Sequence, residues 1–484
     1  MPQTSKAFHK MFPAACTFES AECFPSEQRI TKMSQAGQSA VLFSSEALSW
    51  ARMRQIGFSI ADQGFSVGGM FLVNIALART QTKEEYGIFA LSYSVFTFLT
   101  GLHNAALLEA YTIYGSGRYH RSFPAYAWLL WRSNLLLALG AAAALTLLCG
   151  VLAWTAPTLA SRTVLGLALA CGVLLTASFV RRTFYMRRRP DLAARFSAAY
   201  FVFCGGLLWL SLRLGMLNGF YAFAIAAVAW SVAAIFVMRE LPERAAGPVF
   251  LELEPKYWAE HWKYSRWVLV TALVFQLTTQ AYYWLAAGYL SVKEVADLRA
   301  MYNLVTPVEQ IFVAMAMLIL PVMSYRYAEK RMAGLLPLWK LYGLATVLIT
   351  GSFAVAVNIF GKPVMHVIYA GKFDDVASLL GTLATLPVVM GIGNTMNAAL
   401  KALEKPQAVF YAYVTGGAAT FLIGIPLVTR LGLRGAVYGM LASAGAYSFA
   451  LGIAFVAAVQ GEGYAAPLAA ATKQGPLQRT AGKI

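Results

Sequence analysis

The hydrophobic pattern is clearest between Ile56 and Ile113, where two long apolar stretches flank a short polar link. The link, residues 79–87, reads RTQTKEEYG. Each apolar stretch exceeds the roughly 20 residues that a helix needs to cross a hydrocarbon core about 30 Å thick. The pattern therefore predicts a transmembrane helical hairpin, and ten similar apolar stretches follow it.

The twelve predicted spans divide evenly around a polar connector. The later ten lie at about residues 123–154, 163–181, 193–212, 217–238, 264–290, 296–324, 336–360, 376–403, 408–429 and 433–459. Since each half has an even number of spans, both halves begin on the same side of the membrane, as parallel repeats do. A short internal match supports the repeat, because TKEEYGIFAL at 82–91 and VKEVADLRAM at 292–301 each open the second span of their half. We therefore predict an all-α polytopic membrane protein with two six-helix lobes.

This division predicts five segments along the chain. They are a polar N-terminal extension at 1–52, an N-lobe at 53–238, a cytoplasmic connector at 239–263, a C-lobe at 264–459 and a cytoplasmic tail at 460–484. The extension has no apolar run long enough for a signal peptide, and the hydrophobic architecture starts just after Met53. We expect the extension to be either disordered or the product of a misassigned start codon.

Composition and charge agree with a membrane protein. Of the residues, 59% are hydrophobic and 13% charged, against about 25% charged in soluble domains. The net charge of +17 comes from basic residues between the spans, which favours an anionic membrane surface over nucleic acid as the partner. With a cytoplasmic N-terminus, 28 of the 39 Lys and Arg residues fall on the cytoplasmic side and 10 on the outer side. Both termini are therefore predicted to be cytoplasmic, and RRTFYMRRR at 181–189 is interpreted as a topology anchor.

The sequence lacks the motifs of the commoner membrane enzymes. There is no phosphate-binding loop GxxxxGK[ST] and no soluble domain long enough to hydrolyse ATP. His103, His261 and His366 are isolated from one another, and the five cysteines form neither a disulfide framework nor a zinc motif. We expect no enzymatic activity, no cofactor and no metal site.

Three charged residues fall inside the predicted spans of the N-lobe, at similar depth in its cytoplasmic half. They are Asp62, Glu109 and Arg132. Charges within a bilayer normally face a protein interior or a wet cavity, so we expect Arg132 to lie between the two carboxylates. Such a triad is either a gate that responds to transport or a structural ion pair between three helices.

The C-lobe has one carboxylate near the middle of the membrane. Glu309 follows Pro307 by two residues, and proline interrupts the backbone ladder of a helix. Gln276 and Gln280 are predicted at similar depth on the preceding span. Glu309 is interpreted as lining a cavity, and a neutral helix contact is the alternative.

Several stretches together resemble polysaccharide exporters of the multidrug/oligosaccharidyl-lipid/polysaccharide (MOP) flippase superfamily. The first hairpin is similar at ADQGFSVGGMFLVNIALARTQTKEEYGIFAL (61–91) and GLHNAALLEAY (101–111). The eighth helix is similar at ADLRAMYNLVTPVEQ (296–310) and LILPVMS (318–324), and later loops at GKPVMHVIYAGKF (361–373) and LVTRLGLRGAVYGMLAS (427–443). The likeness covers about residues 55–460.

The resemblance implies two lobes around a V-shaped cavity that work by alternating access in the bacterial inner membrane. The implied substrate is a lipid-linked saccharide, such as an undecaprenyl-diphosphate oligosaccharide for exopolysaccharide or O-antigen synthesis. The implied partners are a glycan polymerase and glycosyltransferases. Position by position, the resemblance points to a set of cavity or gate residues, namely Asp62, Asn104, Glu109, Arg299 and Glu309.

The sequence departs from what the resemblance implies in the number of positive charges inside its spans. A diphosphate favours a cationic cavity, yet Arg132 is the only basic residue predicted well inside an N-lobe span, and Arg299 is near an outer helix end. Three hypotheses follow: a lipid-linked saccharide flippase, an ion-coupled exporter of small amphiphiles from the same superfamily, and a non-transporting scaffold for glycan assembly. The carboxylates favour the second, and a scaffold would not need Asp62 or Glu309 in the bilayer. The motifs favour the first, which we predict.

The topology is testable with reporter fusions. Fusions at Gly115, Arg188 and Glu254 are expected to be cytoplasmic, because the basic residues concentrate on that side. Fusions at residues 82, 292 and 372 are expected to be external. A cytoplasmic signal at residue 372 would mean that one span has been miscounted.

Overall fold

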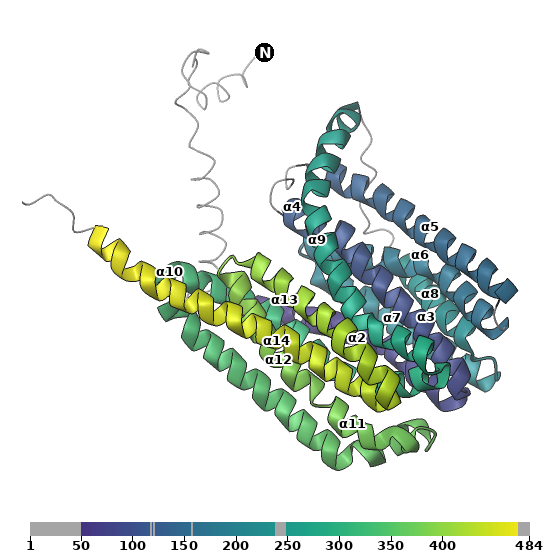
Figure 1. The fold of residues 1–484 in the computed structure, drawn as a ribbon. Helices are drawn as coiled ribbons and strands as arrows, with labels where there is room; N and C mark the ends of the chain where they lie inside the picture. The colour runs from purple at the N-terminus through teal and green to yellow at the C-terminus, as the bar shows by residue number, and fades with distance from the viewer. Residues whose placement is uncertain (1–49, 117–118, 120–121, 156–157, 238–247, 473–484) are drawn as a thin grey trace, which may run out of the picture. The chain divides into compact units, whose positions relative to one another are not determined.

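The computed structural model describes residues 50–116, 119, 122–155, 158–237 and 248–472. These residues form helices with no strand among them, which confirms the predicted fold class (Figure 1). The elements are α2 (Trp50–Thr80), α3 (Lys83–His103), the π-helical turn η1 (Asn104–Leu108), α4 (Glu109–Ser116), α5 (Phe123–Thr155), α6 (Thr158–Met186), α7 (Pro190–Arg213), α8 (Gly219–Val237), α9 (Pro248–Tyr289), α10 (Val292–Tyr369), the 3-10 turn η3 (Asp374–Val376), α11 (Ala377–Leu383), α12 (Leu386–Ala402), α13 (Pro406–Ala419), the π-helical turn η4 (Thr420–Gly424) and α14 (Ile425–Thr472).

The twelve predicted spans are present in the described chain as twelve helical segments. The helix α10 is broken at Arg331 (φ 51°, ψ −140°), and α14 is broken at Gly432 (φ 61°, ψ −136°), so each of them contains a reversal between two segments. The elements α3, η1 and α4 form a single segment, as do α11 with α12 and α13 with η4 and the start of α14.

Nine helical stretches of the described chain are long and apolar enough to cross a membrane. The stretch in α10 runs from Val322 to Tyr369, α3 is not among the nine, and α13 and α14 count as one stretch. The second and eighth segments carry the candidate site residues Asn104, Glu109, Arg299 and Glu309.

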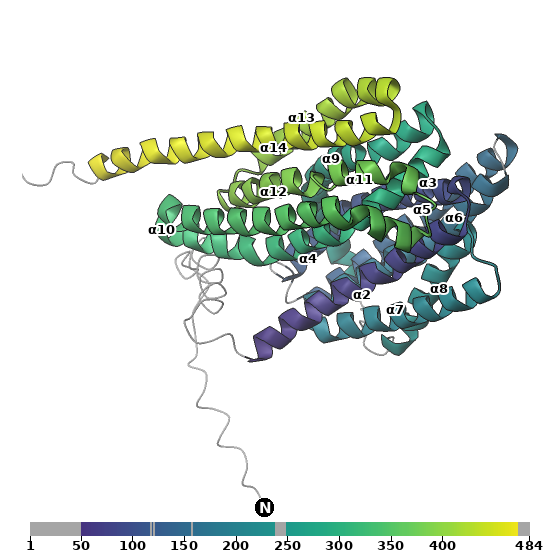
Figure 2. The same cartoon turned by 90° about the horizontal axis from the view of Figure 1, so that it is seen from below.

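The lobes are packed around different helices. In the N-lobe α2 lies along α7, α5 lies along α6, and α8 packs against α6 and α7; in the C-lobe α12 packs between α10 and α14 (Figure 2). The lobes contact each other mainly through α3, which packs on α10 and α9, and through α2, which packs on α10. The second and eighth segments are therefore the inner walls of the two lobes.

Two predicted segment boundaries differ from the helices. The connector was expected at 239–263, but α9 already begins at Pro248, and its inner part is buried against the N-lobe through Tyr257 and His261. The tail was expected from residue 460, and α14 continues to Thr472. Residues 1–49, which hold most of the predicted extension, lie outside the described residues.

The starts of α3 and α10 are equivalent and lie together. The Thr82 hydroxyl accepts a hydrogen bond from the Glu85 amide at 3.2 Å, and residue 291, a serine, caps α10 in the same way. A Cβ atom at Gly87 would lie 2.0 Å from the carbonyl oxygen of Val292. Glycine is therefore required where the first turn of α10 rests on α3.

We expect Gly87→Ala to separate these two helix starts. A methyl group in this contact forces the backbone apart and is expected to destabilise the protein by about 1–3 kcal/mol. The measurement is thermal unfolding in detergent. The control is Gly343→Ala, also in a helix but with open space around it, which is expected to be neutral or stabilising. Equal unfolding temperatures for the two variants would contradict this account of the contact.

Candidate functional site

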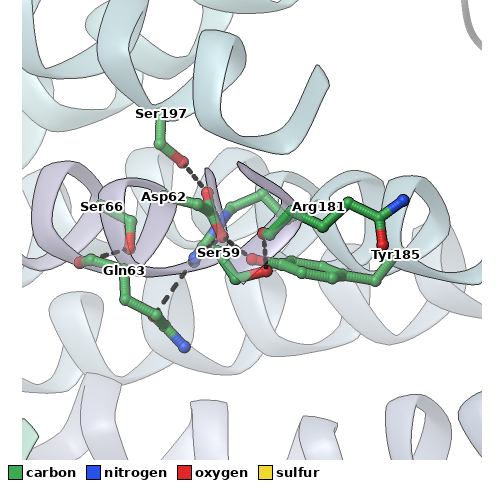
Figure 3. Close-up of polar contacts among 8 residues, drawn as sticks. Ser59, Asp62, Gln63, Ser66, Arg181, Tyr185 and Ser197 are labelled. Atoms are coloured by element: carbon green, nitrogen blue, oxygen red, sulfur yellow. Dashed lines mark hydrogen bonds and ion pairs between the residues drawn. The ribbon is translucent and has the colours of Figure 1, made fainter. Parts of the chain in front are cut away.

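Asp62 is fully buried on α2, and donors from two other helices surround its carboxylate (Figure 3). Arg181 of α6 donates from Nε to Oδ1 at 3.0 Å and from Nη2 to Oδ2 at 2.7 Å. The Tyr185 hydroxyl donates to Oδ2 at 2.8 Å, and the Ser197 hydroxyl of α7 donates to Oδ1. The carboxylate has a bidentate cation and two neutral donors, which is a fully satisfied arrangement.

The predicted triad of Asp62, Glu109 and Arg132 is wrong. Arg132 is exposed on α5, and the cation that binds Asp62 is Arg181. The apolar run of the fourth span stops at Arg181, but α6 continues to Met186, because protein groups surround the polar side chains of its last turns. The first two arginines of the predicted topology anchor, Arg181 and Arg182, are thus part of the N-lobe interior, and Arg132 is not its main cation.

Arg182 lies next to Arg181 and contacts the second segment. Its Nη2 atom donates to Oδ1 of Asn104 at 3.2 Å. Glu109 is exposed, accepts a hydrogen bond from the Tyr264 hydroxyl of α9 at 3.3 Å, and attracts the charge of Arg182. We call Asp62, Asn104, Arg181 and Arg182 the N-lobe polar cluster. It places two adjacent guanidinium groups against partners from α2 and from the second segment.

Arg299 is the centre of a second polar group, between the lobes. Its Nε atom donates to Oδ1 of Asn74 on α2 at 3.4 Å. Its guanidinium lies 4.4 Å from the ring centre of Tyr93 on α3 and 5.9 Å from that of Tyr283 on α9. Cation–π contacts of this kind gain strength as water is removed. Arg299 thus joins four helices from both lobes and lies two turns into α10.

Glu309 lies on the same helix as Arg299 and is partly buried. The Tyr302 hydroxyl donates to its Oε1 atom at 2.6 Å, and the charge of Arg299 attracts it. The structure therefore places Glu309 beside the interlobe group of Arg299, with a tyrosine as its direct partner.

The two glutamines predicted at the depth of Glu309 lie on α9, where they make other contacts. Gln276 is buried, and its Nε2 atom donates to the carbonyl oxygen of Thr97 on α3 at 3.3 Å. It passes directly over Gly101, where a Cβ atom would lie 1.5 Å from Nε2. Gln280 is also buried, one turn further along α9. Gln276 is therefore a contact between the lobes and not a hydrogen-bond partner of Glu309.

Ion pairs connect the lobes at the end where α2 meets α3. Lys83 lies 2.8 Å from Asp297 and 2.8 Å from Asp375, and Lys293 lies 2.8 Å from Glu84. Burial alone would lower the pKa of Lys83, but hydrogen bonds to Asp297 and Asp375 raise it above its usual value. Hydrogen bonding to Lys293 lowers the pKa of Glu84. These shifts stabilise the charged forms of Lys83 and Glu84.

A lysine from the loop after α10 completes this connection. The Nζ atom of Lys372 donates to the carbonyl oxygens of Ala78 and Arg79 at 3.0 Å each, and to that of Gln81. A cation at the carboxyl end of a helix is stabilised by the unpaired carbonyls and the helix dipole there. We call the set Lys83, Glu84, Lys293, Asp297, Lys372 and Asp375 the interlobe clamp. It closes one end of the contact between the lobes.

Metal binding finds no support in the part of the chain that the structure describes. No group of three or more His, Cys, Asp or Glu side chains there is arranged to hold a metal ion. His103 and His261, which are isolated in sequence, are both buried and hydrogen-bonded to Asn134 Oδ1 and to the Ala106 carbonyl.

Known structures resemble this fold, although no protein-family model and no curated protein matches the chain. The inward-facing conformation of a multidrug resistance MATE family transporter of the MOP superfamily has a TM-score of 0.65 and 13% identity, covering 86% of this chain and 100% of that one. The outward-facing conformation of a MATE family transporter gives 0.58 and 13%, covering 84% and 96%. A MOP superfamily transporter from Pyrococcus furiosus gives 0.59 and 13%, covering 84% and 94%.

These likenesses define the class of fold. The chain is a multi-pass membrane protein with the fold of MOP superfamily transporters. Its structure is more similar to the inward-facing than to the outward-facing conformation.

The pairing of Asp62 with Arg181 is expected to be essential for stability. Removing one partner of a buried ion pair costs about 3–5 kcal/mol, because the remaining charge stays buried without a partner. We therefore expect Asp62→Asn and Arg181→Met each to lower the free energy of unfolding by that order. The double variant is expected to lose clearly less than the sum. Denaturant unfolding in detergent measures the coupling, and additive losses would show that the pair contributes nothing specific.

Proposed function

We propose that this protein is an alternating-access transporter that moves a lipid-linked saccharide with an anionic headgroup from the cytoplasmic to the outer leaflet. The observation that carries the proposal is the position of Arg181 and Arg182, two adjacent guanidinium groups held inside the N-lobe. The fold supports a transporter, and the charge supports an anionic substrate. Glycosyltransferases and a glycan polymerase are the partners that such a substrate would require.

The arrangement of the lobes fits one state of such a cycle. The interlobe clamp joins the loops that the distribution of basic residues assigns to the outer side. A closed outer end agrees with the greater likeness to an inward-facing transporter. In this state the N-lobe polar cluster, in the predicted cytoplasmic half, is at the end where the substrate would enter.

The two arginines have different availability for a ligand. Arg181 is engaged in a bidentate pair with Asp62, whereas Arg182 donates to the neutral amide of Asn104. A phosphate oxygen is a stronger acceptor than an amide oxygen, because a charged acceptor shortens and strengthens the hydrogen bond. We infer that an anionic headgroup replaces Asn104 as the partner of Arg182, while Arg181 remains bound to Asp62. In this arrangement Arg182 supplies positive charge in addition to Arg132, the only basic residue that the sequence placed well inside an N-lobe span.

A second function is favoured by a different observation. Glu309 is a carboxylate flanked by Tyr302, near the aromatic rings around Arg299. A carboxylate with aromatic side chains suits a cationic amphiphile. Two of the solved structures with this fold are described as multidrug resistance transporters. An ion-coupled exporter of small amphiphiles is therefore the alternative proposal.

A reconstituted transport assay separates the two functions. The purified protein is placed in liposomes with either a fluorescent lipid-diphosphate oligosaccharide or a fluorescent cationic amphiphile. Arg182→Gln is expected to slow movement of the diphosphate lipid at least about tenfold, the effect of losing one charged hydrogen bond. The control Arg195→Gln removes an exposed arginine of α7 and is expected to have no effect.

The outcomes distinguish all three hypotheses. Normal flipping by Arg182→Gln would overturn the proposed headgroup site. Transport of the cationic amphiphile alone, abolished by Glu309→Gln, would support the exporter instead. Movement of neither substrate by the wild-type protein would favour the scaffold.

A further inference from the structure

The second transmembrane segment contains a π-helical turn between two candidate site residues. This turn, η1, starts at Asn104, and the amide of Glu109 donates to the carbonyl oxygen of Asn104, five residues back. In a regular α-helix, residues five apart are separated by about 140° around the axis. The wider turn brings Asn104 and Glu109 toward the same side.

Both of these residues act on Arg182. Asn104 accepts its hydrogen bond, and Glu109 attracts its charge. If the turn became a regular α-helix with all its residues kept, every position after it would turn by about 100° around the helix axis. Glu109 would then leave the side on which Arg182 lies. The geometry around Arg182 therefore depends on keeping the π-turn in place.

A histidine from another helix holds this turn. His261 of α9 is fully buried, and its Nε2 atom donates to the carbonyl oxygen of Ala106 inside η1 at 2.8 Å. A carbonyl only accepts, so Nε2 carries the proton, and Nδ1 accepts from the hydroxyl of Tyr126 on α5 at 2.9 Å. The ring also stacks on Trp258 with 5.7 Å between centroids and 7° between planes. Position and tautomer of the imidazole are both fixed.

We propose that His261 is a positioning residue for the N-lobe site. It keeps the π-turn in the register that directs Asn104 and Glu109 at Arg182, and it makes that register depend on the position of α9. Because α9 leads into the C-lobe, a movement of the C-lobe is transmitted to the groups around Arg182. The inference rests on the proposed function only for the role of Arg182 in binding the headgroup.

The other end of α9 contacts a second π-turn. Tyr282 lies about 32 Å further along the helix at 1.5 Å per residue. Its hydroxyl hydrogen-bonds to that of Ser443 at 2.7 Å, and Thr420, the first residue of η4, donates to the same Ser443 oxygen at 2.9 Å. A Cβ atom at Gly424, the last residue of η4, would lie 2.5 Å from the Tyr282 hydroxyl. The π-turns of the described chain, one in each lobe, thus both meet α9, and such turns are frequent at functional positions.

Two substitutions of similar size test the hydrogen bond to the π-turn. His261→Gln keeps an N–H donor near the position of Nε2, whereas His261→Asn is too short to reach Ala106. Hydrogen exchange of residues 104–110 is followed by mass spectrometry on the full-length protein in detergent. We expect at least tenfold faster exchange in His261→Asn and near-wild-type exchange in His261→Gln. Equal exchange in the two variants would overturn the proposal.

A control removes a buried polar group from the same helix. Tyr282→Phe loses its hydroxyl contact in the C-lobe, and exchange at 104–110 is expected to stay unchanged. Acceleration as large as in His261→Asn would mean that any weakening of α9 opens the turn, and would also overturn the proposal.

A deletion tests the consequence for the site. Removing Ala105 makes the segment a regular α-helix in which Asn104 and Glu109 are four positions apart and again neighbours. His261→Asn is expected to slow transport of the diphosphate lipid at least fivefold in the wild-type background and not in the deletion background. Equal slowing in both backgrounds would show that His261 acts on transport without the π-turn. A wild-type protein that does not transport this lipid would refute the proposed function, while the exchange experiment would still decide the role of His261.

Discussion

The bidentate pair between Arg181 and Asp62 is the interaction on which the N-lobe depends. A charge near the centre of a bilayer costs about 2.5–3.5 kcal/mol on insertion scales, and water is not available there as a partner. Asp62 therefore needs protein donors, and it obtains them from α6 and α7 through Arg181, Tyr185 and Ser197. A single carboxylate thereby fixes the relative positions of three helices. In this state Asp62 is a structural anchor, and its full set of donors leaves Arg182 as the more accessible cation.

The cost of leaving a buried charge without solvation separates the polar contacts into two groups, those that stay together and those that can open. Asp62 is enclosed by protein, so separating it from its partners would leave a charge without solvation. The side chains of Asp375 and Lys293 in the interlobe clamp are 62% and 59% exposed, and water can replace their partners when they separate. The exposed pairs of the clamp can therefore separate at low cost, whereas the Lys83–Asp297 pair is largely buried, with side chains 21% and 7% exposed. The group around Asp62 is expected to move with the N-lobe.

Much of the fold could be predicted from the sequence, because the length of an apolar run determines whether a helix can cross a bilayer. The position of a polar residue along a helix also follows from the rise per residue. The direction of a side chain around the helix does not follow, because it depends on which helices become neighbours. Arg132 and Arg181 both belong to the predicted inner half, and only packing decides that Arg181 meets Asp62. One signal was available, since Arg181 and Tyr185 are four residues apart and share a helix face.

The π-turns could not be predicted, because one extra residue in a helical turn leaves the hydropathy pattern almost unchanged. Their contacts with α9 explain why that helix matters to both lobes. The first part of α9 is packed in the N-lobe core through Tyr257 and His261, and its later part is packed in the C-lobe through Tyr282. A rotation of one lobe against the other therefore acts on α9 at both of these contacts. Gln276 lies between these contacts, directly over Gly101 of α3, where a Cβ atom would lie 1.5 Å from Nε2, so this close approach of the lobes requires glycine.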